Sequence, residues 1–169
     1  DKGVGEFVEA AKILKQEGVE ARFVLVGEND SENPASILNS QLNEWNELDT
    51  VEWWGNKTGM HKVLAQSNIV CLPSYREGLP KVLLEAASCG RVIIATDVPG
   101  CREIVHNGEN GMLVPLKNAN SLASAIKELI NNPEKRKIMG TNGRRLVENE
   151  FSEETIVFQT LKVYQELLA

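Results

Sequence analysis

The sequence has few cysteines, no long apolar run and less basic than acidic charge. Its three cysteines, Cys71, Cys89 and Cys101, are an odd number without Cys-x-x-Cys spacing, so buried thiols in a reducing cytosol are the simplest interpretation. No apolar run approaches the roughly 18 to 20 residues that cross a bilayer. With 18 Lys and Arg against 24 Asp and Glu, the net charge of -6 argues against a nucleic-acid partner, because neutralising phosphates requires a concentrated basic surface.

Metal-binding and nucleophile motifs are also missing from the sequence. The 2 histidines, His61 and His106, do not neighbour a serine or cysteine in a nucleophile-bearing motif. No group of His, Cys or carboxylate residues has metal-ligand spacing, so we expect no metal and no other cofactor. No Gly-x-Gly-x-x-Gly follows a predicted strand, which disfavours a dinucleotide-dependent dehydrogenase.

What the sequence does contain is a regular alternation of amphipathic helices and apolar strands. The predicted helix and strand pairs cover residues 7–18 and 21–27, 37–45 and 51–55, 60–65 and 69–74, and 80–89 and 91–97. A short strand at 111–115 and three helical stretches, at 121–131, 133–149 and 153–168, follow. Near-continuously apolar strands joined through helices indicate a parallel sheet covered on both faces, so we predict a doubly wound α/β fold with C-terminal helices.

The length of the chain supports a single domain over residues 1–169, because two ordinary domains would need more residues. The opening "DKGVGEFVEA" enters a helix almost at once and carries no Met. We therefore expect the chain to be a piece of something longer.

The stretch "SYREGLPKVLLEAASCG" lies where a predicted strand gives way to a helix. Ligands of doubly wound folds bind at the carboxyl ends of the strands, where helix N-termini point free N–H groups at anions. Gly78 permits close approach of a ligand, and Pro80 suits the first helical position. Glu77 precedes the helix and Glu85 lies inside it, so the two carboxylates can accept hydrogen bonds from the sugar and the ribose of a nucleotide-sugar whose diphosphate lies between them.

A simpler interpretation of this pair stays open on spacing alone. Glutamates eight residues apart arise readily by chance in a chain with 24 acidic residues, and the helix dipole favours acids near a helix start.

The longer stretch "PSYREGLPKVLLEAASCGRVIIATDVPGCREIV" resembles the donor-binding motif of retaining glycosyltransferases of family four. The resemblance implies that Glu77 contacts the transferred sugar and stabilises positive charge in the transition state, and that Glu85 binds the ribose. It implies further donor contacts from Lys2, which neutralises the leaving diphosphate, from the loop of Gly78, Leu79 and Pro80, and from Gly55, Asn56 and Lys57 near the base. Leu79-Pro80 stands where Phe-Gly is commoner in the family, and Pro80 has no N–H to donate to a phosphate.

Members of this family have two domains facing across a cleft, the GT-B arrangement. The resemblance implies that this chain is the C-terminal, Rossmann-like domain, lacking its first strand and the N-terminal acceptor domain. Alone, it should bind a donor and transfer nothing efficiently, because transfer requires donor and acceptor in register. It is similar to members that build bacterial surface polysaccharides from UDP-linked N-acetylhexosamines on glycan or lipid-linked acceptors.

Two other functions remain as alternatives: a nucleotide-sugar 2-epimerase-like enzyme of the same fold, and a non-catalytic nucleotide-binding α/β module. A basic helical region also has two interpretations; its residues are Lys135, Arg136, Lys137, Arg144 and Arg145. The default is a solvated helix face, and the alternative is peripheral contact with anionic lipid at the inner face of the membrane.

Overall fold

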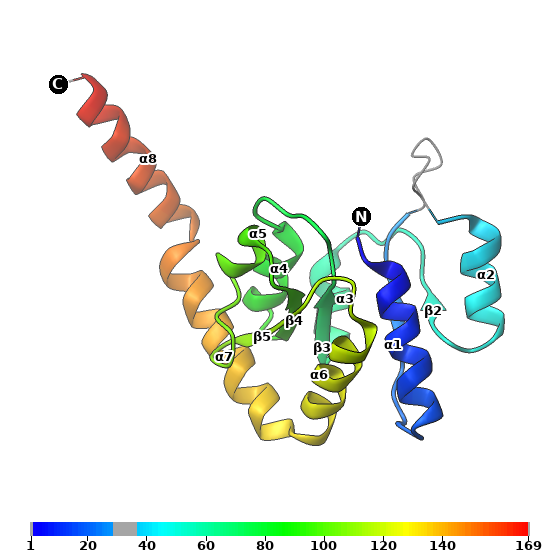
Figure 1. The fold of residues 1–169 in the computed structure, drawn as a ribbon. Coiled ribbons are helices and arrows are strands. Elements are labelled where there is room, and N and C mark those ends of the chain that lie inside the picture. The colour runs from blue at the N-terminus through cyan, green and yellow to red at the C-terminus, as the bar shows by residue number, and fades with distance from the viewer. Residues whose placement is uncertain (1, 29–36, 169) are drawn as a thin grey trace.

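The computed structural model describes residues 2–28 and 37–168, and within them helices and strands alternate as the sequence predicts (Figure 1). In chain order the elements are α1 (Val4–Gln16), β1 (Val24–Leu25), α2 (Asn39–Glu47), β2 (Glu52–Trp53), α3 (Met60–Gln66), β3 (Ile69–Leu72), α4 (Lys81–Ser88), β4 (Val92–Thr96), α5 (Pro99–Arg102), β5 (Gly111–Val114), α6 (Ala119–Asn131), α7 (Pro133–Glu150) and α8 (Glu153–Leu168). Helix α5 was not predicted, because four residues that include a proline and a glycine carry no helical periodicity.

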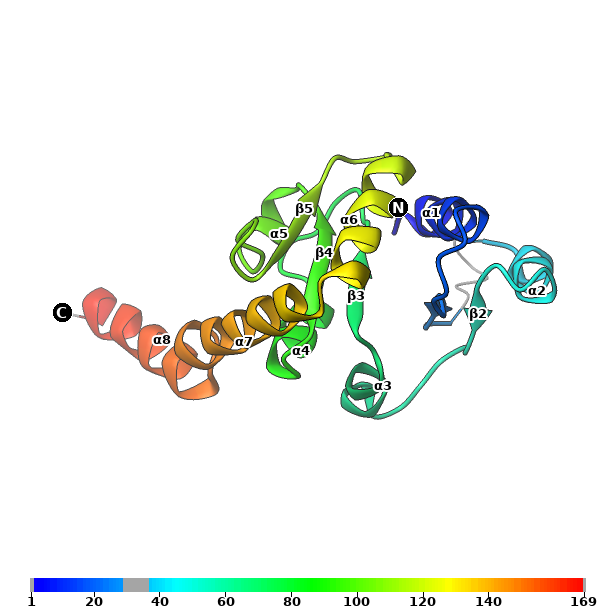
Figure 2. The same cartoon turned by 90° about the horizontal axis from the view of Figure 1, so that it is seen from below.

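All strand pairs are parallel, but they form two sheets where we expected one. One sheet has the order β3-β4-β5, and the other contains only β1 and β2. Figures 1 and 2 place this small sheet beside β3, on the side away from β4. The strands predicted at 21–27 and 51–55 shrink to two residues each. Two strands that pair only with each other form few backbone hydrogen bonds, because isolated two-stranded sheets are marginally stable.

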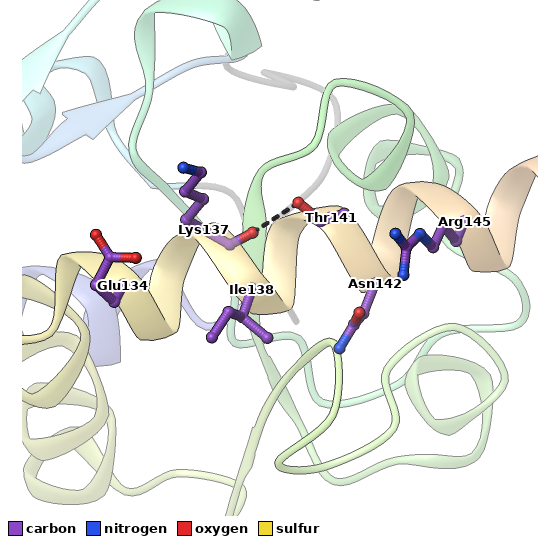
Figure 3. A pocket seen from close by; sticks show the side chains of 6 residues that line it. All are labelled: Glu134, Lys137, Ile138, Thr141, Asn142 and Arg145. Atoms are coloured by element: carbon purple, nitrogen blue, oxygen red, sulfur yellow. Dashed lines mark hydrogen bonds between the residues drawn. The ribbon is translucent and has the colours of Figure 1, made fainter.

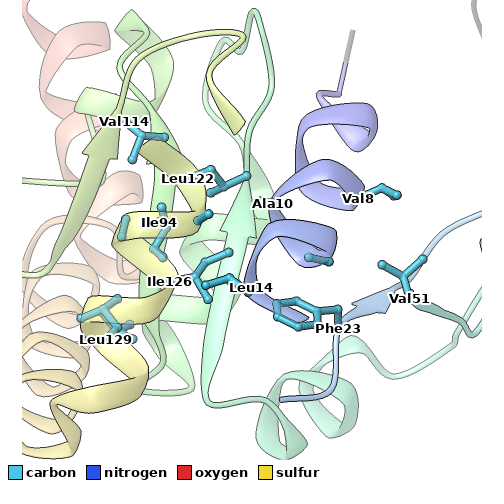
Figure 4. Close-up of a cluster of buried hydrophobic side chains, with 14 of the residues drawn as sticks. Val8, Ala10, Leu14, Phe23, Val51, Ile94, Val114, Leu122, Ile126 and Leu129 are labelled. Atoms are coloured by element: carbon cyan, nitrogen blue, oxygen red, sulfur yellow. The ribbon is translucent and has the colours of Figure 1, made fainter. Parts of the chain in front are cut away.

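Strand β4 divides the hydrophobic core between the two faces of the larger sheet, because its five residues are all buried and alternate in direction. Val92 and Ile94 belong to a cluster with residues of α1 and α6, which Figure 4 shows. Ile93 and Ala95 belong to a second cluster, with residues of α4 and α7. Helices therefore cover both faces, which confirms the doubly wound α/β fold.

The three C-terminal helices differ in how they are packed. Helix α6 starts at an Asn118 side chain that accepts a hydrogen bond from the Ser121 N–H at 2.9 Å, and its apolar side lies against α1. Helix α7 packs on α4, while α8 extends away from the sheet with no buried residue (Figure 1). None of the helices in the described ranges is both long and apolar enough to cross a membrane.

Candidate functional site

The segment that joins β3 to α4, residues 73–80, is called the Glu77 loop below, and it is anchored on three sides. The Thr96 hydroxyl on β4 donates a hydrogen bond to the Ser74 carbonyl. The Tyr75 hydroxyl donates to a carboxylate oxygen of Glu6 on α1 at 2.6 Å. The ammonium of Lys117, after β5, lies 5.0 Å from the centre of the Tyr75 ring, which is within cation–π range. The loop is therefore held by α1, by β4 and by the segment that follows β5.

Glu77 forms an ion pair with Lys2, a residue 75 positions away in sequence, at 2.7 Å. The Glu77 side chain is only 11% exposed, whereas that of Lys2 is 67% exposed. Lys2 reaches the loop because it directly precedes Gly3, the N-cap of α1, whose φ of 67° lies in the left-handed region. The structure thus brings together the two charged residues that the family resemblance assigns to the transferred sugar and the diphosphate.

The pKa of the Glu77 carboxyl is held below its ordinary value. Burial acts to raise this pKa, but the hydrogen bond from Lys2, the nearby Ser74 hydroxyl and the Lys2 charge together lower it by more. The Ser74 hydroxyl is itself buried and makes no hydrogen bond of normal geometry within the described residues. Lys2 is therefore the main partner that keeps Glu77 ionised.

We expect Lys2→Met to raise the pKa of Glu77, measured by a carbon NMR titration of its side-chain carboxyl. A carboxyl whose pKa is lowered by folding stabilises the fold above the unfolded pKa, roughly 4.3, and this contribution disappears as the pH falls through the lowered folded pKa. Lys2→Met should therefore flatten the dependence of stability on pH in that acid window. Lys12→Met is the matched control, because Lys12 pairs with Glu9 on α1 instead. An unchanged Glu77 titration in Lys2→Met would contradict the assignment.

The N-terminus of α4 differs in one detail from the sequence prediction. Helix α4 begins at Lys81, and Pro80 is its N-cap in an extended conformation instead of the first helical residue. The Leu83 N–H donates to the Pro80 carbonyl at 3.0 Å, and no side chain caps the helix. Within the described residues, the N–H groups of Lys81 and Val82 are left without an acceptor. Any anion at this terminus would be met by these two groups rather than by Pro80.

The remaining residues predicted for the Glu77 loop and α4 lie around this terminus. Gly78 and Leu79 are exposed, and Pro80 is buried. Glu85, in the second turn of α4, has one carboxylate oxygen 3.6 Å from the Lys81 ammonium. Along the chain, Glu77 therefore precedes the free N–H groups of α4 and Glu85 follows them.

The loop of Gly55, Asn56 and Lys57 follows β2 at the carboxyl end of the small sheet. The Gly55 carbonyl accepts a hydrogen bond from the Gly27 N–H at 3.0 Å, and the Asn56 amide donates to Glu28 at 3.3 Å. Lys57 is exposed. Among the described residues, no hydrogen bond or ion pair joins this loop to Glu77 or Glu85, so its contact with the base stays a prediction.

The two adjacent tryptophans of β2 have structural partners. Trp53 packs on the core and donates from its indole N–H to the Gly27 carbonyl at 3.1 Å. The Arg22 guanidinium lies 5.8 Å from the centre of the Trp54 ring, and the Trp54 indole N–H donates to a Glu52 carboxylate oxygen at 3.0 Å. Arg22 also donates two hydrogen bonds to Glu52, which lower the pKa of that carboxyl to about 2. The Trp54 side chain is therefore held by Arg22 and Glu52.

The basic region of α7 is largely occupied by local contacts. Lys135 pairs with Glu128 at 2.5 Å, Arg144 pairs with Glu148 at 2.7 Å, and Arg136 donates to the last carbonyls of α6. Lys137 and Arg145 have no ion-pair partner among the described residues. Both line an open hollow on α7, shown in Figure 3. Most of the region is therefore explained by the packing of α7 on α6 and by helix stability.

No group of three or more His, Cys, Asp or Glu residues in the described ranges could hold a metal ion.

Comparison with known families gives one match that covers most of the chain. The model of the family described as "Glycosyl transferases group 1" matches residues 1–146. The chain is 34% identical over 167 residues to N,N'-diacetylbacillosaminyl-diphospho-undecaprenol alpha-1,3-N-acetylgalactosaminyltransferase of Campylobacter jejuni, covering 99% of this chain and 42% of that protein. It is 33% identical over 168 residues to N-acetyl-alpha-D-glucosaminyl L-malate synthase of Bacillus anthracis, covering 99% and 43%.

Solved structures show the same fold. Sucrose-phosphate synthase from Thermosynechococcus elongatus superposes with a TM-score of 0.81 at 28% identity, over 96% of this chain and 42% of that one. The C-terminal domain of a glycosyl transferase group 1 family protein from Francisella tularensis superposes with a TM-score of 0.78 at 26% identity, over 90% of this chain and 80% of that one. The chain spans less than half the length of the curated relatives named above.

Proposed function

Because the chain belongs to the group 1 glycosyl transferase family, we propose that it is the donor-binding domain of a retaining GT-B glycosyltransferase. The complete protein moves a hexose or N-acetylhexosamine from a nucleotide-sugar to a glycan or lipid-linked acceptor. A UDP-linked N-acetylhexosamine is the preferred donor in this proposal. Two relatives support the N-acetylhexosamine. One is named as an N-acetylgalactosaminyltransferase of a diphospho-undecaprenol compound, and the other as an N-acetyl-alpha-D-glucosaminyl L-malate synthase.

The observation that carries the proposal is the Lys2–Glu77 ion pair on the loop that leads into the free N–H groups of α4, with Glu85 in the second turn of the same helix. A diphosphate at these groups gains the helix dipole and two hydrogen-bond donors. Glu85, one turn into the helix, then accepts from the ribose hydroxyls. Glu77 accepts from the hydroxyls of the sugar, and its negative charge stabilises the positive charge that develops as the glycosidic bond breaks.

In this proposal Lys2 changes its partner when the donor binds. In the free protein it neutralises Glu77 at 2.7 Å. A bound diphosphate is a stronger attraction for the exposed Lys2 ammonium, because it carries more negative charge than one carboxylate. Lys2 then stabilises the departing diphosphate, and Glu77 is left with its full charge toward the sugar.

The rest of the enzyme is part of the same proposal. We infer a further parallel strand between β1 and β3 and an N-terminal domain that holds the acceptor. The division of the strands into two adjacent sheets and the greater length of the relatives both support this inference. The 169-residue chain alone should bind a donor and turn it over negligibly, because the acceptor is not held in register.

Calorimetric titration of the chain tests the proposal. UDP-N-acetylglucosamine, GDP-mannose and ADP-glucose are titrated in EDTA, since the proposed binding needs no metal. We expect heat of binding for the UDP-sugar and a higher affinity for it than for UDP alone. If none of these nucleotides binds, the proposal is wrong. Incubation of the complete protein with the donor separates a transferase from a 2-epimerase, because only the epimerase changes the sugar without an acceptor.

Peripheral membrane contact rests on two residues, Lys137 and Arg145. Each cation near an anionic surface contributes about 1 kcal/mol, so the pair supplies weak binding that added salt removes. We expect the chain to sediment weakly with phosphatidylglycerol vesicles at low salt, and Lys137→Gln with Arg145→Gln to reduce vesicle binding roughly 10-fold or more. Lys135→Gln with Arg144→Gln is the matched control on the same helix, because both of these charges are already paired. Sedimentation that persists in high salt, or none at all, would contradict the proposal.

A further inference from the structure

Gly100 on α5 lies so close to the Glu77 loop that no residue with a Cβ atom would fit in its place. A Cβ atom added at Gly100 would lie 2.1 Å from the Gly78 carbonyl oxygen and 2.4 Å from that of Glu77. Real Cβ atoms essentially never approach a heavy atom within 3.0 Å. The φ of Gly100 is not in the left-handed region, so the requirement for glycine comes from this close approach alone.

A second glycine meets the start of the same loop. A Cβ at Gly3, the N-cap of α1, would lie 2.0 Å from the Pro73 carbonyl oxygen. The start of the loop therefore rests on α1 and its centre on α5. These contacts are between backbone atoms, which cannot relieve a clash by changing rotamer as a flexible side chain can.

We propose that Gly100 is a positioning residue, which sets the place of the Glu77 carboxylate through direct contact between α5 and the loop backbone. This inference rests on the proposed function, because it concerns the residue assigned to the transferred sugar. A methyl group at position 100 must push the loop away by about 1 Å, and a displacement of that size is enough to disrupt a catalytic arrangement. The movement carries Glu77 away from Lys2 and from the sugar, while Glu85 stays on α4.

Other glycines of the chain show that this contact is specific. A Cβ at Gly78 or at Gly5 would have no heavy atom within 4 Å. Gly5 lies on the exposed side of α1, close in sequence to Gly3, and is therefore the matched control.

The test compares Gly100→Ala and Gly5→Ala in the 169-residue protein. Calorimetry with UDP-N-acetylglucosamine and with UDP should show that Gly100→Ala removes the affinity advantage of the sugar nucleotide, a loss of roughly 10-fold or more, and changes UDP affinity by less than about threefold. The carbon NMR titration of Glu77, which needs no ligand, should show its pKa returning toward the ordinary value. Gly5→Ala should change neither measurement.

The outcomes separate this inference from the proposed function. If the unmodified chain binds no nucleotide, the proposed function fails, but the Glu77 titration still tests the positioning. If Gly100→Ala folds and leaves both measurements unchanged, Gly100 does not position Glu77. If it does not fold, Gly3→Ala displaces the start of the loop at Pro73 instead, and the same two measurements are made on it. Failure of both variants to fold would mean that these glycines serve only the fold, and the proposal would be wrong.

Discussion

Glu77→Gln is expected to weaken binding of UDP-N-acetylglucosamine about tenfold or more, because it removes a hydrogen bond to a charged acceptor worth roughly 1.5 to 3 kcal/mol. Binding of UDP alone should hold or tighten. The amide no longer pairs with Lys2, whose ammonium becomes free for the diphosphate. Glu85→Gln should instead weaken UDP and the UDP-sugar alike, because the ribose is common to both.

Calorimetry of both variants with both ligands measures this difference. Glu20→Gln is the control, since Glu20 is an exposed acid remote in sequence from the Glu77 loop and α4. Equal and small effects of the Glu77 and Glu85 changes would favour a non-catalytic nucleotide-binding module. Equal and large effects would mean that Glu77 contacts the nucleotide, and the assignment of the sugar to Glu77 would be wrong.

Gly140→Ala is expected to destabilise the protein by about 2 kcal/mol, although alanine is the better helix former. Gly140 lies on the side of α7 that meets the end of α4, and a Cβ there would lie 2.2 Å from the Gly90 carbonyl oxygen. Gly90 cannot move aside easily, because its φ of 64° ends α4 in a left-handed conformation. Overpacking against backbone therefore outweighs the gain of roughly 1 kcal/mol in helix propensity.

Gly143→Ala, one turn further along α7, provides the matched comparison. A Cβ at this position would meet its nearest neighbour, Ala87 Cβ, at 3.6 Å, an ordinary contact. We expect it to leave stability unchanged or raise it by up to about 1 kcal/mol. Urea unfolding of the two variants measures both effects as shifts of the midpoint at constant slope. Similar midpoints for the two variants would contradict the close packing of α7 on α4.

The sequence is sufficient for most of the fold because periodicity is a local property. Helices α4, α6, α7 and α8 begin and end within two residues of their predicted limits. Strand length was less predictable, as β1 shows. The length of a strand depends on the neighbouring strands with which it forms hydrogen bonds, and not on its own apolar residues alone. The number of sheets could not be predicted for the same reason.

The candidate site also contains residues that the local sequence pattern predicts and residues that depend on contacts distant in sequence. Glu77 and Glu85 could be placed at the start of α4 from local pattern, whereas the 2.7 Å contact of Lys2 with Glu77 joins residues 75 positions apart. Only the family resemblance pointed to Lys2. Gly100 lies within the stretch that resembles the family motif, but the sequence did not show why a glycine is needed there, since this requirement arises from contact with another loop. The basic residues of α7 were a mixed set. Arg144 pairs with Glu148 one turn along the same helix, whereas the pairing of Lys135 with Glu128 depends on how α7 meets α6.

The anchoring of the Glu77 loop by Tyr75, Thr96 and Lys117 bears on the thermodynamics of ligand binding. Ordering a flexible loop around a ligand costs conformational entropy at the moment of binding, and this cost lowers affinity. Here the loop is already fixed to α1, β4 and the segment after β5 in the free protein. The entropy of that segment is lost on folding, so a donor meets a preformed surface. Weak donor binding by this domain would then reflect a small number of contacts with the donor, and not the entropy cost of ordering a flexible loop.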